Sequence, residues 1–271
     1  MVLIGLVAGC AVSDKSTLSS NQLADTLTDR WQLSTQSINW QVTDQHVDHL
    51  EFSGEQVAAI IYYGADEHGN LTLKRKLVWP LLRTIPDDTH ASLIHDFALE
   101  ISPTVSINQQ QARHEQLKQV NFSGILRLSS ELGQQVSVTR TLSPSTTKPL
   151  MIEQLRYVNQ GEKPARLTIG KVDYQFNTDR DKGVYGVYQI SASSDKFGEF
   201  LLAAGESVTV NVQYVATKRG QNRRFDSQAE IQKRQAYVAS LQNKLQLVTP
   251  DANINKMFDF AKLRAAESIY R

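Results

Sequence analysis

The feature that most constrains the fold is a long series of short alternating segments between residues 37 and 215. In these segments apolar, β-branched and aromatic residues alternate with polar ones, the pattern of a strand with one buried face. Turn-forming residues interrupt the pattern at hairpin spacing, among them Gly69, Gly133, Gly161 and Gly205. The sequence therefore predicts a mainly β fold, a large antiparallel two-sheet sandwich of about a dozen strands.

The periodicity changes from two residues to about 3.6 residues after Phe225. A first helix is predicted over residues 226–247, with Asp226 or Ser227 as its N-cap. Because it directly follows the last strand, we interpret it as a linker helix between the sandwich and the segment after residue 247.

A second amphipathic helix is predicted within residues 248–271. Thr249 would cap it and Pro250 would occupy its first turn. Its apolar residues form one stripe: Ile254, Met257, Phe258, Ala261, Ala265 and Ile269. Such a stripe is more often an intramolecular face than a partner-binding one, so we expect this helix either to dock on the sandwich or to fray.

The only cysteine, Cys10, follows an apolar run that ends in Val7, Ala8 and Gly9, and a polar stretch comes after it. This arrangement resembles a bacterial lipoprotein signal peptide, which is cut before a cysteine that carries lipid. The resemblance implies a membrane anchor at Cys10 and a location in the bacterial cell envelope (periplasm or outer membrane), or secretion. The run is short and no Lys or Arg precedes it, so a buried N-terminal strand with a core cysteine is the alternative.

The final residues, 245–271, look like the opening of the catalytic domain in six-hairpin glycosidases. In that family an (α/α)6 barrel follows an N-terminal β-supersandwich and a helical linker. Residues 51–80 and 80–93 resemble the sandwich of bacterial members. The resemblance implies four segments: a signal and tether (1–22), a β-supersandwich (23–225), a linker helix (226–247) and the start of a truncated barrel (248–271).

Members of this family hydrolyse glycosidic bonds of oligo- or polysaccharides with a general acid and a second carboxylate that activates water, usually with inversion. Both carboxylates come from barrel loops, which would lie beyond Arg271. The resemblance therefore implies no catalytic residue in this chain, an inactive fragment and no cofactor. It implies carbohydrate and the missing C-terminal helical barrel as partners.

Two other functions remain open at this point. The chain could be a non-catalytic lipoprotein of the envelope that binds glycans or has a structural role. It could also be a sandwich that assembles with a separately encoded barrel.

Residues 79–90 hold the richest polar cluster, and we predict that they bind substrate. Trp79 would stack on a sugar face, Arg83 would donate hydrogen bonds, and Asp87, Asp88 and His90 would bind hydroxyls. The simpler interpretation is a rigid loop, and a third is a loop that packs against the barrel. Asp87 and Asp88 do not form a hydrolytic pair, because neighbours on an extended chain point to opposite sides.

Composition and motifs exclude several other classes. Lys and Arg total 29 against 28 Asp and Glu, a net charge of +1, so no nucleic-acid partner is predicted. The His- and Asp-containing stretches 44–49 and 90–96 lack the spacing of a metal site, and no metal is predicted. No nucleotide-binding loop or nucleophile elbow is present.

Overall fold

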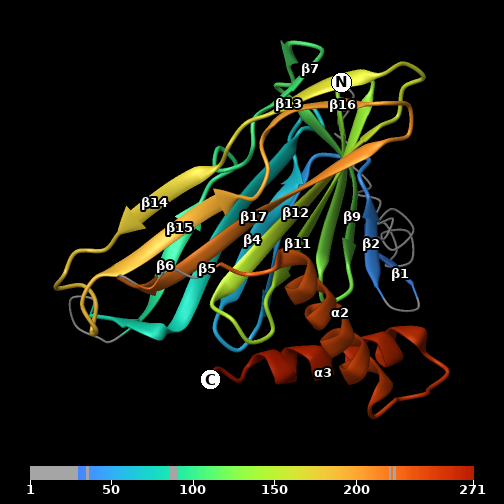
Figure 1. Cartoon of the computed structure of the whole chain (residues 1–271). Helices are drawn as coiled ribbons and strands as arrows, with labels where there is room; N and C mark the ends of the chain where they lie inside the picture. Colours follow the sequence, from blue (N-terminus) through green and yellow to red (C-terminus); the bar gives the residue numbers. More distant parts are fainter. Residues whose placement is uncertain (1–29, 35–36, 86–90, 220, 222–223) are drawn as a thin grey trace, which may run out of the picture. The chain divides into compact units, whose positions relative to one another are not determined.

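The computed structural model describes residues 30–34, 37–85, 91–219, 221 and 224–271. Its contacts divide the chain into Met1–Arg30 and one compact unit, Trp31–Arg271. The predicted signal segment and Cys10 lie outside the described residues. The following description concerns the unit Trp31–Arg271 (Figure 1).

The largest sheet has nine strands, and every neighbouring pair is antiparallel. Its strands, in spatial order, are β1 (Gln32–Leu33), β2 (Ile38–Gln41), β9 (Glu115–Phe122), β10 (Leu126–Leu132), β11 (Val136–Pro144), β12 (Leu150–Asn159), β17 (Ser207–Lys218), β15 (Tyr188–Ser194) and β14 (Asp173–Asn177). The predicted turn at Gly133 connects β10 and β11, whereas the one at Gly205 leads into β17 from a strand of another sheet; both glycines have positive φ, 60° and 76°. Glycine reaches this backbone region without steric cost, which is why these two positions signal turns in the sequence.

Two four-stranded sheets, also antiparallel, complete the β structure of the described residues. One consists of β3 (His46–Ser53), β4 (Ala58–Ala65), β5 (Leu71–Thr84) and β6 (Ala91–Phe97). The other consists of β16 (Gly198–Leu202), β13 (Ala165–Ile169), β7 (Val105–Ile107) and β8 (Gln110–Gln111). The prediction of a mainly β antiparallel sandwich followed by helices is confirmed.

The core lies between the inward faces of these sheets. One continuous apolar cluster includes Leu77 of β5, Leu128 of β10 and Leu167 of β13, so it joins all three sheets. Burial alternates along the strands, as in β10, where every second residue from Leu126 to Leu132 is buried. The strands therefore pack through the faces that their residue alternation predicts.

Helix α2 (Ser227–Asn243) follows β17, as predicted. Asp226 is its N-cap, and its side chain accepts a hydrogen bond of 3.0 Å from the backbone N–H of Ala229. Ile231 of this helix is buried and packs in a small apolar cluster with Leu150, Ile152 and Val215. The helix is thus fixed to the outer face of β12 and β17.

Helix α3 (Ala252–Glu267) forms, but its N-cap is Asp251 and not Thr249. Oδ1 of Asp251 accepts hydrogen bonds from the backbone N–H groups of Asn253 (2.8 Å) and Ile254 (3.4 Å). Thr249 Oγ1 instead accepts from the Asp251 N–H at 3.2 Å. The carboxylate caps because it reaches two N–H groups and its negative charge suits the positive end of the helix.

Helix α3 docks on the sandwich, but not through its predicted stripe. Its buried residues include Leu263 and Glu267, and Phe260 stacks on Phe122 of β9 with 5.8 Å between ring centroids. Met257 and Ile254, from the stripe, are 71% and 48% exposed. The apolar stripe therefore faces outward, and another face of the helix makes the contact.

A buried arginine fixes both helices to the sheet. Arg234 of α2 donates from Nη1 to the carbonyl oxygen of Ser53 (2.7 Å) and from Nε to that of Gly124 (3.2 Å). Its Nη2 forms an ion pair with Glu267 of α3, whose own carbonyl oxygen accepts a 2.6 Å hydrogen bond from Ser53 Oγ. Polar interactions thus decide which face of α3 is buried, because a buried charge needs its partner. No helix in the described part of the chain is long and apolar enough to cross a membrane.

Candidate functional site: a buried ion network and the cleft beside it

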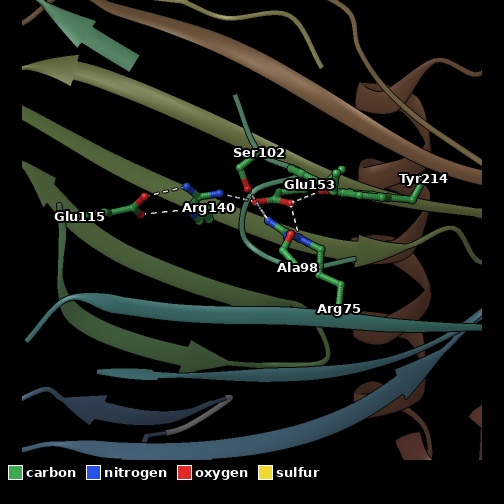
Figure 2. Close-up of polar contacts among 8 residues, drawn as sticks. Arg75, Ala98, Ser102, Glu115, Arg140, Glu153 and Tyr214 are labelled. Carbon is green, nitrogen blue, oxygen red and sulfur yellow. Dashed lines mark hydrogen bonds and ion pairs between the residues drawn. The ribbon is translucent and has the colours of Figure 1, made fainter. Parts of the chain in front are cut away.

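The most unusual polar feature is an ion pair between the two main sheets (Figure 2). Arg75 of β5 and Glu153 of β12 have fully buried side chains. Nε of Arg75 lies 2.7 Å from Oε2 of Glu153, and Nη2 lies 2.9 Å from Oε1. Because β5 and β12 belong to different sheets, this bidentate pair connects the two layers of the sandwich.

The pair continues into a second arginine and carboxylate. Arg140 of β11 contacts Oε1 of Glu153 through Nη1. Its Nε and Nη2 donate to Oε1 and Oε2 of Glu115 at 3.0 and 2.6 Å. Two guanidinium groups and two carboxylates therefore alternate along one chain of ion pairs, and their charges balance.

Hydrogen bonds complete the network around Arg75 and Glu153. The hydroxyl of Tyr214 donates to Oε2 of Glu153 at 2.8 Å. Arg75 donates from Nη1 to the carbonyl oxygen of Ala98 (3.1 Å) and from Nη2 to Oγ of Ser102 (2.8 Å). Each charged group thus has several partners, as buried charges require.

The electrostatics keep these groups ionised. Burial alone would raise the pKa of Glu153, but the guanidinium groups of Arg75 and Arg140 outweigh it and lower that pKa to about 2. Burial alone would lower the pKa of Arg140, but the two carboxylates raise it well above its usual value. A catalytic acid needs a pKa near the working pH. The lowered pKa and the complete burial of Glu153 therefore match a structural ion pair better than a general acid.

A cleft of about 460 Å³ adjoins the outer end of this network, and we name it the Tyr157 cleft. The loops 99–105 and 111–115 and the strand residues Leu132, Arg140 and Tyr157 contribute to its lining. A second hollow of about 750 Å³, the outer cleft, shares Gln111, Arg113 and His114 with it, so the two are adjacent.

Tyr157 and Glu115 belong to the lining of this cleft, but they differ in accessibility. Tyr157 is 1% exposed, and its hydroxyl has no hydrogen-bond partner among the described residues. Burial raises the pKa of Tyr157, so the hydroxyl stays protonated. Glu115 lines the same cleft and is 12% exposed. The cleft therefore offers the carboxylate of Glu115, whereas the hydroxyl of Tyr157 is buried beneath the lining and is not accessible from the cleft.

Trp79 and Arg83, two of the residues predicted to bind substrate, do not form a common site. Trp79 is fully buried, and its indole N–H donates to the carbonyl oxygen of Pro149 at 3.1 Å. The expectation that it presents a ring face to a sugar is wrong, because Trp79 points inward from β5 at an alternating core position. Arg83 is exposed, and its carbonyl oxygen accepts a 2.6 Å bond from the Tyr188 hydroxyl.

The other predicted residues, Asp87, Asp88 and His90, lie outside the described residues, so their role stays a prediction. Elsewhere in the described part of the chain, no three His, Cys, Asp or Glu side chains gather as a metal site. His95, from one of the two His-containing stretches, instead shares a 2.9 Å hydrogen bond with the Tyr174 hydroxyl.

Sequence reasoning missed the network and the Tyr157 cleft. Arg75 and Glu153 are 78 positions apart, and Arg140 and Glu115 are 25 apart. One signal was present: Arg75 and Arg140 stand at inward positions of otherwise apolar strand faces. A charge at such a position requires a buried partner, although the alternation cannot say which one.

Comparison with known proteins supports the fold. No family model and no curated protein matches the sequence. Among solved structures, the chain is similar to a protein from the human microbiome assigned as a kojibiose phosphorylase, with a TM-score of 0.54 and 7% sequence identity. The similarity covers 88% of this chain but only 42% of that one. The chain thus has the sandwich fold found in one part of a longer carbohydrate-active protein.

Proposed function

We propose that this chain is the sandwich part of a glycosidic-bond-cleaving enzyme, with the catalytic domain in a helical barrel that is not part of residues 1–271. The observation that supports it best is the fold similarity to 42% of a protein assigned as a kojibiose phosphorylase. More than half of that protein has no counterpart here. The order of sandwich, linker helix and further helix agrees with the resemblance to six-hairpin glycosidases.

The two carboxylates of the buried network agree with a catalytic site in the barrel. Two acids that share a reaction need different pKa values and access to one bond. Glu115 and Glu153 are both held by arginines, and Glu153 is fully buried. We therefore place the acid and base of the reaction in the barrel, as the resemblance implies.

The group that attacks the glycosidic bond distinguishes a hydrolase from a phosphorylase. The family resemblance favours water, and thus a hydrolase. The name of the similar structure favours phosphate, and thus a phosphorylase. Both reactions cleave the same kind of bond, so the sandwich is compatible with either.

The test compares the 271-residue chain with a product extended through any coding sequence downstream of Arg271. Both are incubated with a panel of disaccharides, with and without inorganic phosphate, and free sugar and sugar phosphate are measured. The extended product should cleave at least one disaccharide, and the short chain none. The proposal is refuted if the short chain cleaves a disaccharide and a point substitution within that chain abolishes the activity.

A glycan-binding or structural envelope protein is the alternative. A stop codon directly after Arg271, with no barrel encoded nearby, would favour it. Lipid attachment at Cys10 and envelope location are part of both proposals. Metabolic labelling with a radioactive fatty acid should mark the wild type and not the variant Cys10→Ser, and equal labelling of both would refute attachment there.

A further inference from the structure

Strand β14 (Asp173–Asn177) ends the nine-stranded sheet on one side (Figure 1). It pairs with β15, and no described strand pairs with its other side, which we name the β14 edge. Such an edge carries backbone N–H and C=O groups that can bind a further strand. The opposite end of the sheet is β1, which has only two residues and offers a much shorter edge.

The hydrogen bonds to β15 decide which residues face the β14 edge. The carbonyl oxygen of Val172 and the N–H of Thr178 each form a 3.0 Å hydrogen bond with the backbone of β15. In an antiparallel pair, residues that bond to the neighbouring strand alternate with residues that do not. The backbone groups of Asp173, Gln175 and Asn177 therefore face the β14 edge, and they have no hydrogen bond to another described residue.

The edge of β3 is protected in a way that the β14 edge is not. There the carbonyl oxygens of Glu51 and Ser53 accept hydrogen bonds from Arg264 and Arg234, both at 2.7 Å. Side chains from the two helices thus occupy the backbone groups of that strand. Proline, lysine or a bulge also protects many edge strands, and β14 contains neither proline nor lysine. The β14 edge is therefore open to a partner strand.

Contacts with the other main sheet hold β14 in position. The hydroxyl of Tyr174 shares a 2.9 Å hydrogen bond with His95 of β6, and the rings of Tyr174 and Phe97 lie 5.7 Å apart. Phe176, on the same face of β14 as Tyr174, is 44% exposed. Because β14 is already ordered, binding a further strand does not have to order it. The added strand would also cover part of the Phe176 ring.

The sequence of β14 is complementary to itself in the antiparallel direction. When two copies pair about a two-fold axis at Gln175, Asp173 lies opposite Asn177, and Tyr174 lies opposite Phe176. This register joins all three residues that face the edge, through about six backbone hydrogen bonds. It also sets one aromatic side chain opposite another, which is a favourable cross-strand pair.

Charges beyond the strand favour the same register. Lys171 would lie opposite Asp179 of the second copy, and both residues are exposed. The ammonium group of Lys171 donates to Asp173 of its own chain at 2.5 Å and has two further N–H groups for the second copy. Moving the axis by one residue to Phe176 would instead place Asp173 opposite Asp179, two like charges.

We propose that two copies of this chain associate through the β14 edge, so that the nine-stranded sheet of one copy continues into that of the other. The interface is isologous, because the same residues contribute from both copies. A strand of five residues buries less surface than a typical stable interface, so the association is weak and depends on concentration. It does not depend on the catalytic proposal, because residues 171–179 make the whole contact.

The test is sedimentation velocity on the whole 271-residue chain, from about 10 μM to about 1 mM, the range in which a weak interface fills. The mass should rise from 30.4 kDa toward twice that value. Hydrogen exchange followed by NMR should slow at the amides of Gln175 and Asn177 over the same range. The amide of Phe176 should not change, because it already bonds to β15.

Gln175 provides a matched pair of variants. Gln175→Pro removes the N–H that faces the edge and places a ring there, but it removes no hydrogen bond to β15. It should weaken the association by more than about tenfold, since the central pair of hydrogen bonds is lost. Gln175→Ala keeps the N–H and should associate like the wild type. Thermal unfolding of both variants checks that each is folded.

A charge exchange tests the register without altering the backbone. Lys171→Asp alone and Asp179→Lys alone should each weaken the association by roughly two- to thirtyfold, because each dimer holds two such pairs. The double variant restores opposite charges across the two-fold axis and should recover the association. Both side chains are exposed, so this test also holds if Gln175→Pro fails to fold.

Three results would overturn the proposal. The first is a monomer at every concentration. The second is a dimer that folded Gln175→Pro and the single charge variants leave unchanged, which would place the contact elsewhere, for example on the exposed stripe of α3. The third is a double charge variant that associates no better than the single ones. Cleavage activity enters none of these measurements.

Discussion

Replacing Glu153 by Gln tests whether the buried ion network stabilises the sandwich. The substitution keeps the size of the side chain but removes the only carboxylate that pairs with Arg75 in the described residues. Arg75 would then be a fully buried cation that keeps a carbonyl, a hydroxyl, the Tyr214 ring and the new amide near it, but no carboxylate that pairs with it among the described residues. Breaking a buried pair in this way costs about 3–5 kcal/mol of the free energy of unfolding.

The pKa of Glu153 gives a second value for the contribution of its ion pairs to the free energy of unfolding. It is 4.5 for the free side chain and about 2 in the fold. At about 1.4 kcal/mol per pH unit, this difference corresponds to roughly 3 kcal/mol. Because the pKa is lowered in the fold, the contribution is complete above about pH 4.5 and disappears as the pH falls toward 2.

The assay is urea unfolding followed by tryptophan fluorescence, measured at neutral pH and at several values down to pH 2. Glu153→Gln should lower the free energy of unfolding by about 3–5 kcal/mol at neutral pH. The difference in the free energy of unfolding between wild type and variant should shrink below about pH 4.5. There the Glu153 carboxylate of the wild type becomes protonated, so the wild type also loses the charge that the variant lacks.

Two variants serve as controls. Glu199→Gln breaks the pair of Arg166 and Glu199, whose side chains are 52% and 62% exposed, and should cost less than about 1 kcal/mol. The double variant Arg75→Met with Glu153→Leu removes one charge of each sign. It should be less destabilised than Glu153→Gln, because no cation is left unpaired. A Glu153→Gln protein as stable as Glu199→Gln would refute the reasoning.

Two further predictions concern the helices and their contact with the sandwich. Gly124 has a φ of 84°, and a Cβ there would lie 2.8 Å from Cγ2 of Val238, so Gly124→Ala should cost about 2–4 kcal/mol by thermal or urea unfolding. Gly133 has a φ of 60° but open space around it, so Gly133→Ala should cost only about 1 kcal/mol, and equal losses would contradict the packing explanation. Asp251→Ala should destabilise the first turn of α3 by about 1 kcal/mol and speed hydrogen exchange at Asn253 and Ile254, and unchanged exchange would exclude Asp251 as the cap.

The class of fold could be predicted because it depends on local rules. Successive side chains of a strand point to opposite faces, so a sequence period of two predicts which residues are buried. Gly133 predicts a turn because glycine adopts positive φ without steric cost. The change to a helical period after Phe225 likewise predicted α2, and it left two candidates for the cap, Asp226 and Ser227, of which the structure has Asp226. The cap of α3 was misplaced by two residues, since Thr249 and Asp251 are both good caps and only the geometry selects one.

The functional residues could not be predicted in the same way. Trp79 was interpreted as a sugar platform because an aromatic beside polar residues is typical of one, yet its strand position turns it into the core. The orientation of α3 depends on Arg234 and Glu267, 33 positions apart, and not on its most apolar face. Amphipathic periodicity ranks faces by hydrophobicity, whereas a buried ion pair can outweigh that ranking.

The sequence by itself determined the alternation, the turns and the helical ending, because each arises from neighbouring residues. The tertiary structure decided which charges meet. It placed Arg75 against Glu153 across two sheets and Arg140 between Glu153 and Glu115. These juxtapositions depend on strand order and sheet packing, which bring together residues that no local pattern relates.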